Sequence, residues 1–460
     1  MRQYPAYPEY KPTGCDWFPD IPAHWKIDRA KWSVISCQNG VWGADPDGDD
    51  DLVCIRVADF DRQSLRISTE KLTMRSIAEK DRRNRLLKSG DLLLEKSGGG
   101  EQQLVGAVVE FDEPFPAVNS NFIARMVARD DMNSRFLVYL HSHLYSGRVN
   151  FRSIKQTTGI QNLDSQAYLD ELITYPPLEE QKAIARFLDL KTAQIDGLIE
   201  KKKQLLDKLA EKRTALISHA VTKGLDLSVP MKASGVVWLG EVPSHWTIMR
   251  ARYASTFVTS GSRGWAEYYS DSGSVFLRIT NVSRDSVDLL LHDIQRVSPP
   301  ESSEGKRTAT QSGDVLVSIT ADLGSVAVIP DGFESAYVSQ HLALVRPNAD
   351  RVLGRWMAYQ FFSTSGQAQL TGAGYGGTKI QLGLGDVKDV WLALPPTGEQ
   401  EAICAWIGAE VDKLKCQSVS IRDVILRLSE YRSALITNAV TGKIDVRGFD
   451  IPQIAEEVAS

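Results

Sequence analysis

Two hydrophobic patterns alternate along this chain, and each predicts a different kind of structure. Short apolar runs of the β-strand type, separated by glycine and aspartate, occur before residue 175 and again between residues 226 and 394. The predicted strands are 52–57, 91–95, 105–111, 122–127, 275–279, 314–319, 326–329 and 343–345. Helical patterns intervene, for example at 135–144 and 354–362. We therefore expect two α+β domains.

The second pattern begins after each of two Pro-Pro pairs, Pro176-Pro177 and Pro395-Pro396. Proline ends the preceding strand and is tolerated at the start of a helix. Residues 178–222 contain no proline and only one glycine, Gly197. Apolar residues recur at seven-residue steps, with one interruption at Lys202. In the first copy they are Leu188, Ile195, Leu209 and Leu216, and we assign Leu198 and Leu205 to the other apolar position of the heptad. In the second copy they are Ile407, Leu414, Ile421, Leu428 and Leu435.

A heptad pattern of this kind is typical of helices that pack along a seam. The alternative is a single surface helix with an ordinary apolar face. We favour two long helices that pair as an intramolecular, antiparallel coiled coil, because both segments share one register. Nothing within a globular domain would cover a helix of about 45 residues, which is about 65 Å long.

The chain repeats itself once. Blocks of the first half return in the same order 219 to 223 positions later. The paired blocks are 17–25 with 238–246, 55–57 with 277–279, 89–93 with 312–316, 176–184 with 395–403, and 213–222 with 432–441. Ordered blocks at a nearly constant offset indicate a tandem duplication with pseudo-two-fold symmetry.

The duplication predicts four segments: a globular domain at 1–175, a central helical spacer at 176–225, a second globular domain at 226–394, and a C-terminal helical spacer with a tail at 395–460. A rigid spacer between two like modules fixes the distance between the features that they contact. Dimeric DNA-binding proteins use the same logic when their symmetry sets the spacing of half-sites.

Several of these pieces occur together in one known family. They are the run Pro176-Pro177-Leu178-Glu179-Glu180-Gln181, the strand starts Gly90-Asp91 and Gly313-Asp314, and the paired helix ends at 213–222 and 432–441. In this order and duplication, the chain resembles the specificity (S) subunit of type I restriction–modification systems over nearly its whole length. One departure is Gly398, which stands where the first copy has Glu179 and loosens the first turn of the second helix.

The resemblance implies that segments 1–175 and 226–394 are target-recognition domains, each of which reads one half of a bipartite sequence in double-stranded DNA. It implies that the helices set the gap between the halves and dock two methyltransferase (M) subunits, which methylate adenine N6. Motor-nuclease (R) subunits would complete the restricting complex, which defends the cell against foreign DNA. S-adenosylmethionine, ATP and Mg²⁺ would then belong to the partner subunits, with no cofactor in this chain.

The motifs expected of an enzyme are missing or incomplete. No Pro-Pro pair carries the Asn/Asp and aromatic residues of an adenine methyltransferase, and no phosphate-binding G-x-x-x-x-G-K-[ST] run is present. Residues 372–377 spell G-x-G-x-x-G without a preceding strand, the acidic run at 45–51 lacks the glycine and glutamate of a calcium loop, and 200–202 (E-K-K) lies on the heptad helix. His24 and His245 each sit in a Pro-x-His-Trp turn, where packing is the favoured interpretation. We predict no catalytic residue and no metal site.

Candidate DNA-binding residues lie in glycine-containing loops at matching places in both copies. Lysine reads guanine or pairs with phosphate, glutamine pairs with adenine, hydroxyl groups position phosphates, and glycine lets the main chain come close. The first domain offers Lys96, Ser97, Gly98, Gln102, Gln103, Lys155, Gln156, Thr158 and Gln161, and the second offers Thr320, Tyr375, Gly377, Thr378, Lys379 and Gln381. Residues 158–161 align with 378–381, so the loop is common to both copies. The alternative to DNA binding is that these segments are surface loops that contact nothing.

Composition and charge narrow the class of protein. The chain of 460 residues is 43% hydrophobic and 24% charged, which is typical of globular proteins, and its net charge of −5 disfavours a protein that coats nucleic acid. Segments 1–175 and 226–394 carry −3 and −2, so DNA binding would rest on local contacts with help from partners. Five scattered cysteines, and the absence of a leader or of a long apolar stretch, predict a soluble, cytoplasmic protein.

Two rival functions remain at this point. A single-chain restriction or methylation enzyme would require a methyltransferase motif. A coiled-coil scaffold that binds only proteins would not require glycine-, lysine- and glutamine-containing loops at matching places in both copies.

Overall fold

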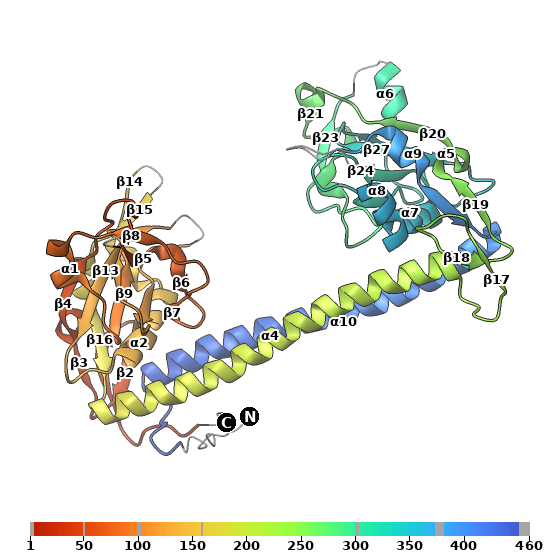
Figure 1. Cartoon of the computed structure of the whole chain (residues 1–460). Helices are drawn as coiled ribbons and strands as arrows, with labels where there is room; N and C mark the ends of the chain where they lie inside the picture. The colour runs from red at the N-terminus through yellow and green to blue at the C-terminus, as the bar shows by residue number, and fades with distance from the viewer. Residues whose placement is uncertain are drawn as a thin grey trace. The chain divides into compact units, whose positions relative to one another are not determined.

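The computed structural model describes residues 4–48, 51–99, 103–157, 160–299, 303–372 and 381–449. It divides into two units: unit 1 contains Met1–Lys201 together with Asp423–Ser460, and unit 2 contains Lys202–Arg422. Each unit holds one α+β domain and parts of two long helices (Figure 1). The α+β class predicted from the alternating patterns is therefore confirmed. No helix in the described ranges is long and apolar enough to cross a membrane.

The domain of unit 1 is built on a four-stranded antiparallel sheet of order β11-β9-β13-β4. A second sheet has the order β12-β5-β8, in which β12 and β5 run parallel, and a third has the order β10-β15-β14. Helix α2 packs on β11 and β9. The elements are β1 Tyr10–Cys15, β2 Phe18–Pro22, β3 Lys26–Arg29, β4 Val34–Asn39, β5 Asp51–Ile55, β6 Phe60–Asp61, β7 Arg66–Ile67, β8 Met74–Ser76, α1 Glu79–Arg85, β9 Asp91–Glu95, β10 Ser97–Gly98, β11 Val108–Phe111, β12 Ala117–Asn119, β13 Ile123–Ala128, α2 Ser134–Ser146, β14 Ile154–Thr157, β15 Ile160–Leu163, α3 Ser165–Leu169 and β16 Leu172–Tyr175.

The domain of unit 2 repeats this topology. Its antiparallel sheet has the order β20-β27-β24-β25, and its second sheet has the order β21-β23-β22-β26 with β22 and β26 parallel. The elements are β17 Met231–Ala233, β18 Glu241–Pro243, β19 Thr247–Arg250, α5 Ala251–Ala254, β20 Ser255–Ser260, β21 Tyr269–Ser270, β22 Ser274–Leu277, β23 Gln295–Val297, α6 Ser303–Thr308, β24 Val315–Ser318, β25 Val326–Val328, β26 Ala336–Val338, β27 Leu342–Pro347, α7 Gly354–Phe362, α8 Thr364–Gly372, α9 Leu384–Asp389 and β28 Trp391–Leu394. The duplication seen in the sequence is therefore a duplication of the fold.

The repeated Ser-Gly-Asp block starts the central strand of each domain. Gly90 and Gly313 have φ of 88° and 79°, which a side chain would disfavour. Asp91 is buried, accepts the backbone N–H of Lys88 at 2.7 Å, and forms an ion pair with Arg125 at 2.6 Å from the neighbouring strand. The Ser-Gly-Asp motif therefore forms the turn that leads the chain into the central strand.

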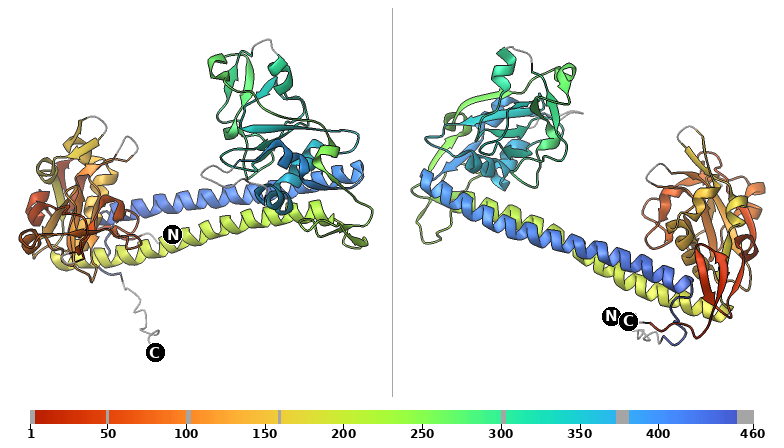
Figure 2. Two further views of the ribbon diagram at one scale, coloured as in Figure 1. Left: turned by 45° about the horizontal axis from the view of Figure 1, so that its top comes forward. Right: turned by 180° about the vertical axis from the view of Figure 1, so that it is seen from behind.

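The long helices are α4 Leu178–Lys223 and α10 Thr397–Val440. In unit 1 the start of α4 packs with the end of α10, and Leu188 and Ile195 share a core with Leu435. In unit 2 the end of α4 packs with the start of α10, where Ile217 shares a core with Ile407. Figure 2 shows these helix segments side by side in both views. The antiparallel pairing predicted from the heptads is confirmed.

One part of the predicted seam is wrong. Leu198 and Leu205 are 49% and 40% exposed, whereas Ile199 is 5% exposed and belongs to the core of unit 1. In a heptad, the second seam position can lie three or four residues after Ile195. Helix α4 buries the residue four positions on, Ile199. Leu198 and Leu205 therefore lie outside the helix pair.

The start of each long helix is held by the Pro-x-His-Trp turn of its own unit. In unit 1 the Glu180 carboxylate lies 2.8 Å from His24 Nε2 and accepts hydrogen bonds from the Trp25 indole N–H at 2.9 Å and the Tyr7 hydroxyl at 2.7 Å. Burial raises the pKa of the Tyr7 hydroxyl, and its bond to Glu180 raises that pKa further. His24 therefore has the packing role that its turn predicts.

The same arrangement holds the second helix. The Glu399 carboxylate lies 2.8 Å from His245 Nε2 and accepts a bond from the Trp246 indole N–H at 3.0 Å. The turn thus explains why the glutamate of the Pro-Pro-x-x-Glu-Gln run and the distant His-Trp pair recur together in the sequence.

Candidate nucleic-acid interface

The two segments predicted to bind DNA in the first domain come together in one small sheet. Strand β10 pairs antiparallel with β15, which places Ser97 opposite Asn162 and Gly98 opposite Gln161. Strand β14 adds to the other edge of β15, and there Lys155 lies opposite Asn162. Residues separated by about sixty positions in the sequence therefore share one surface, which we call the reading sheet of unit 1.

Polar side chains of this sheet are tied to neighbours by short contacts. The Lys96 ammonium donates to Asn39 Oδ1 at 2.7 Å, and the Ser97 hydroxyl donates to Asn162 Oδ1 at 2.6 Å. Lys155 is 76% exposed and pairs with Asp164 at 2.8 Å. These groups are therefore pre-positioned, and their amides, hydroxyls and ammonium groups are the types that contact base edges and phosphates.

Gln161 occupies a different environment from the one predicted. Its side chain is only 3% exposed, and its Oε1 accepts the backbone N–H of Val105 at 3.2 Å. In this structure Gln161 therefore supports the loop that precedes β11, and it does not present its amide at the surface. The exposed neighbour Asn162 takes the outward-facing position on β15.

The second domain brings its candidate segments together in the same way. Thr320 forms an isolated antiparallel bridge with Gln381, and the Leu382 N–H donates to the carbonyl of Ile319 at 2.9 Å. The Thr320 hydroxyl lies 2.7 Å from Nδ1 of His341. We call the paired segments at Thr320 and Gln381 the reading edge of unit 2. The reading sheet and the reading edge are the reading surfaces of the two units.

Several candidates lie outside the described residues. These are Gln102, Thr158, Tyr375, Gly377, Thr378 and Lys379, together with the G-x-G-x-x-G run after Gly372, and of Gln156 only the backbone is described, in β14. Gln103 is described and exposed, and its amide lies beside the Arg62 guanidinium. For all of them a contact with DNA stays a prediction.

The backbone pairing corrects the alignment of the two loops by one residue. In unit 1 the Leu163 N–H donates to the carbonyl of Lys96 at 2.8 Å, as the Leu382 N–H does to that of Ile319 in unit 2. Leu163 therefore corresponds to Leu382, and Gln381 corresponds to the residue before Leu163, Asn162. Matching the letters Ile-Gln in both copies had paired Gln381 with Gln161.

A third segment of each reading surface was missed in the sequence. It is the turn between β12 and β13, where the Phe122 carbonyl accepts the N–H of Lys96 at 2.8 Å; in unit 2 the His341 carbonyl accepts the N–H of Ile319 at 3.0 Å. Phe122 is 50% exposed. The signal was available, because 118–123 and 337–342 match at an offset of 219, but neither stretch contains a glycine-rich loop.

The reading sheet of unit 1 rests on a buried carboxylate. Glu95, the last residue of β9, is 1% exposed and pairs with Arg62 at 2.9 Å. Burial raises the pKa of the Glu95 carboxyl, and the Arg62 charge only partly opposes that shift. Residue 318 of unit 2, a serine, stands at the corresponding strand end, so the two surfaces differ beneath as well as on top.

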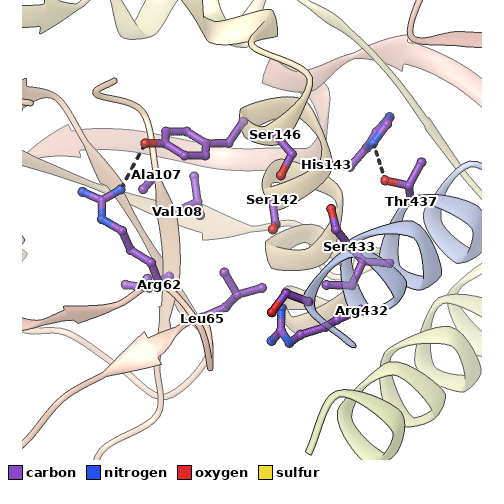
Figure 3. Close-up of a pocket in the computed structure, with 14 residues that line it drawn as sticks. Arg62, Leu65, Ala107, Val108, Ser142, His143, Ser146, Arg432, Ser433 and Thr437 are labelled. Carbon is purple, nitrogen blue, oxygen red and sulfur yellow. Dashed lines mark hydrogen bonds between the residues drawn. The ribbon is translucent and has the colours of Figure 1, made fainter. Parts of the chain in front are cut away.

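A polar cavity lies elsewhere in unit 1, where α2, β11 and the end of α10 meet (Figure 3). Arg62, His143 and Arg432 contribute to its lining. Arg62 is paired with Glu95, and Arg432 with Asp196 at 3.0 Å, so both guanidinium charges are already balanced. The cavity is therefore a junction between domain and helix, and not a site built for an anion.

In each unit, an arginine near the C-terminal end of a long helix contacts the α+β domain. It is Arg432 of α10 in unit 1 and Arg213 of α4 in unit 2. In unit 1 Arg432 pairs with Asp196 of α4 and donates to the carbonyl of Gln63, while the Gln63 amide donates to Asp196 at 2.8 Å. In unit 2 the corresponding Arg213 pairs with Asp285 at 2.9 Å, at the position that matches Gln63. We call these contacts the domain–helix junctions.

Within the described ranges no group of three or more histidine, cysteine or carboxylate side chains is placed to hold a metal ion. The two histidines of the Pro-x-His-Trp turns are engaged with Glu180 and Glu399. At matching places in both units lie exposed amides and aromatic rings, together with half-buried hydroxyls.

The comparisons with known proteins agree with this picture. Residues 66–208 match the family described as "Type I restriction modification DNA specificity domain". The chain is 22% identical to the type I restriction enzyme EcoBI specificity subunit of Escherichia coli, covering 72% of this chain and 70% of that one. It is 21% identical to the putative type I restriction enzyme MjaX specificity subunit of Methanocaldococcus jannaschii, covering 93% and 95%.

Solved structures share the fold. A chain from a study of complex assembly and conformational transition of the type I R-M system matches with a TM-score of 0.65 at 16% identity, covering 92% of this chain and 99% of that one. The HsdS subunit of Thermoanaerobacter tengcongensis matches with a TM-score of 0.50 at 17% identity, covering 92% and 98%. With its duplicated α+β domains and its paired long helices, the chain is similar to type I restriction–modification specificity subunits over nearly its whole length.

Proposed function

We propose that this chain is the DNA sequence-recognition subunit of a type I restriction–modification complex, and that each unit reads one half of a bipartite target in double-stranded DNA. One observation carries the proposal. The same backbone pairing in both units presents different side chains at matching positions, namely Ser97 and Thr320, Asn162 and Gln381, and Phe122 and His341. A shared scaffold with different exposed groups is what two different half-sites require.

The proposed recognition is mainly by base contacts. The matched groups are exposed amides and half-buried hydroxyls, which form hydrogen bonds with base edges. The exposed Lys155 of the sheet is already paired with an aspartate. Since the two domains are slightly acidic, partner subunits would supply much of the contact with the phosphate backbone.

The long helices would hold the two half-site readers at a set distance and dock the partners. Apolar side chains outside the helix pair support docking: Leu198, Leu205, Trp406, Val419 and Leu426 are each between 40% and 58% exposed. Two methyltransferase subunits, which carry S-adenosylmethionine, and the motor-nuclease subunits, which carry ATP and Mg²⁺, are the proposed partners. The chain itself would take no part in the chemistry of adenine N6 methylation or of cleavage.

Selection from random DNA tests the proposal. The chain would be assembled with its methyltransferase partner, incubated with a pool of random duplexes, and the bound fraction sequenced. We expect a motif split into two constant halves by a stretch of fixed length and arbitrary sequence. A pool without any enriched motif would contradict the proposal and favour a protein-binding scaffold.

A further inference from the structure

A hollow with apolar walls opens on the reading sheet of unit 1. Its lining includes Ser97 and Gly98 of β10, and three large apolar side chains stand around it: Trp42, Phe122 and Ile160, which are 38%, 50% and 55% exposed. Apolar side chains so exposed on a surface otherwise made of amides and hydroxyls require an explanation.

The walls of the hollow are held in place. The Arg75 guanidinium lies 4.6 Å from the centre of the Trp42 ring, donates to the Trp42 carbonyl at 3.3 Å, and pairs with Asp45 at 2.5 Å. The Phe122 carbonyl accepts the N–H groups of Lys96 and Ser97 at 2.8 and 3.2 Å. Both aromatic rings are therefore presented from backbone that the rest of the domain fixes.

Among the described residues, the lining of the hollow is also nearly free of charge. Arg56 is the charged residue in its lining, and its guanidinium is bound to the buried Asp59 at 2.8 Å. Gly98 and Gly99 contribute no side chain, so that a bound group can come close to the main chain. Such a site favours a small apolar group over a phosphate or a charged ligand.

The matching positions of unit 2 are polar. The N–H groups of Val41 and Ser262 donate to the carbonyls of Asn119 and Val338, at 2.8 and 2.7 Å, which aligns the two segments. The residue after Val41 is Trp42, whereas the residue after Ser262 is an arginine, and the counterpart of Phe122 is a histidine. The apolar character therefore belongs to the reading surface of unit 1 and not to the shared scaffold.

We propose that this hollow receives the C5-methyl group of a thymine, so that unit 1 reads a half-site containing a T·A pair at one position. The thymine methyl is the apolar group that base pairs present in the major groove, and apolar side chains such as Phe contact it. The inference rests on the proposed function, since it assumes that the reading sheet faces DNA. Asn121, in the same lining, carries an amide of the type that forms hydrogen bonds with base edges.

Replacing thymine by deoxyuridine tests the proposal, because it removes the methyl group alone. Each thymine of the selected duplex would be replaced in turn, and binding to the chain assembled with its methyltransferase partner would be measured. We expect one position, in one half of the split motif, at which the substitution weakens binding about fourfold, the value of one buried methyl group. Thymines of the other half should not depend on Phe122.

Phe122→His, which installs the residue found in unit 2, should reduce that discrimination to less than about twofold. Trp32→His is the matched control, because Trp32 is an exposed aromatic residue of unit 1 outside the hollow and should leave the discrimination unchanged. If a split motif is selected but deoxyuridine binds as well as thymine everywhere, the methyl proposal is overturned while the recognition function stands. If Phe122→His also abolishes binding in that case, Phe122 acts as a wedge between bases instead. A pool without a motif overturns the function itself.

Discussion

At the scale of single residues, the two reading surfaces carry different exposed side chains on matching backbone positions. Asn162 and Gln381 occupy one backbone position with amides of different length, while Leu163 and Leu382, the next residues, are both buried. Glutamine has one methylene group more than asparagine, which displaces its amide. The displacement is larger than a bidentate hydrogen-bonded contact with a base tolerates. Specificity can therefore change without disturbing the fold.

Lys155 gives a prediction about the phosphate backbone. It is the exposed lysine of the reading sheet, and on DNA it would exchange its partner Asp164 for a phosphate. Lys155→Ala should weaken binding of the assembled complex for all sequences alike and reduce the slope of log K against log salt by about one. Lys413→Ala is the control, because Lys413 is similarly exposed and paired with Glu410 on α10. An unchanged slope for Lys155→Ala would exclude a phosphate contact.

His141 gives a prediction about pH. It is fully buried in α2, its Nδ1 lies 2.8 Å from the Tyr168 hydroxyl, and desolvation lowers its pKa to about 4. Because the unfolded chain binds the proton near pH 6.5 and the folded chain does not, stability is complete above that value and is lost as pH falls toward 4. Between pH 7.5 and 5.0 this group should cost about 2 kcal/mol of the free energy of unfolding.

Urea titrations at the two pH values measure that loss. His141→Gln should be less stable at pH 7.5 but should lose about 2 kcal/mol less on going to pH 5.0. His219→Gln, at an exposed histidine, should show the pH dependence of the unaltered chain. Equal losses for His141→Gln and the unaltered chain would show that His141 does not cause the effect.

At the scale of elements, the starts of the two long helices allow a direct comparison. Glu180 satisfies two buried donors, Trp25 and Tyr7, whereas Glu399 satisfies one, Trp246. A buried donor without a partner costs about 1–3 kcal/mol. Glu180→Ala should therefore destabilise the protein by about 1–2 kcal/mol more than Glu399→Ala does.

The comparison has an internal control in the same helical turn. Glu179 is exposed and pairs with Lys182, so Glu179→Ala should change the free energy of unfolding by less than about 0.5 kcal/mol. Chemical unfolding followed by tryptophan fluorescence measures all three variants. Glu180→Ala and Glu399→Ala with equal costs would show that the buried donors find other partners.

The domain–helix junction of unit 1 predicts an effect on the gap between half-sites. Arg432 links the Gln63 loop to Asp196 of α4. If the junction fixes the domain on the helices, Arg432→Ala should broaden the range of gap lengths that the complex accepts, measured by selection from duplexes with the gap varied. Arg447→Ala, at an exposed arginine that pairs with the half-buried Asp445, should leave that range unchanged. A uniform loss of affinity at one sharp gap length would contradict a positioning role.

The elements were predictable to the extent that local patterns determine them. The strands around Gly90-Asp91 and the helices after Pro176-Pro177 and Pro395-Pro396 follow from turn chemistry and periodicity. The seam position at Ile199 was not predictable, because steps of three and four residues both maintain a heptad and Leu198 is equally apolar. Only the partner helix decides which of the two is buried.

The candidate site shows the same limit. The sequence indicated that 95–103 and 152–162 both contribute, since each has a counterpart in the other copy, and the structure places them in one sheet. It did not indicate that Gln161 faces inward and Asn162 outward, because an alternation of period two leaves the register open by one residue. Phe122 was missed because an isolated aromatic residue at a strand start is usually part of a core.

At the scale of the whole molecule, the central claim is that the chain is duplicated and that each unit recognises its own half-site. Each unit has its own core, its own reading surface and its own domain–helix junction. Changes in one reading surface should therefore alter recognition of one half-site and leave the other intact.

Two variants test this claim most directly. Asn162→Ala in unit 1 and Gln381→Ala in unit 2 would each be assembled with the methyltransferase partner and profiled by selection from random duplexes. We predict that Asn162→Ala relaxes base preference in one half of the split motif, and that Gln381→Ala relaxes it only in the other half. Relaxation of the same half by both variants, or of both halves by either one, would contradict the account.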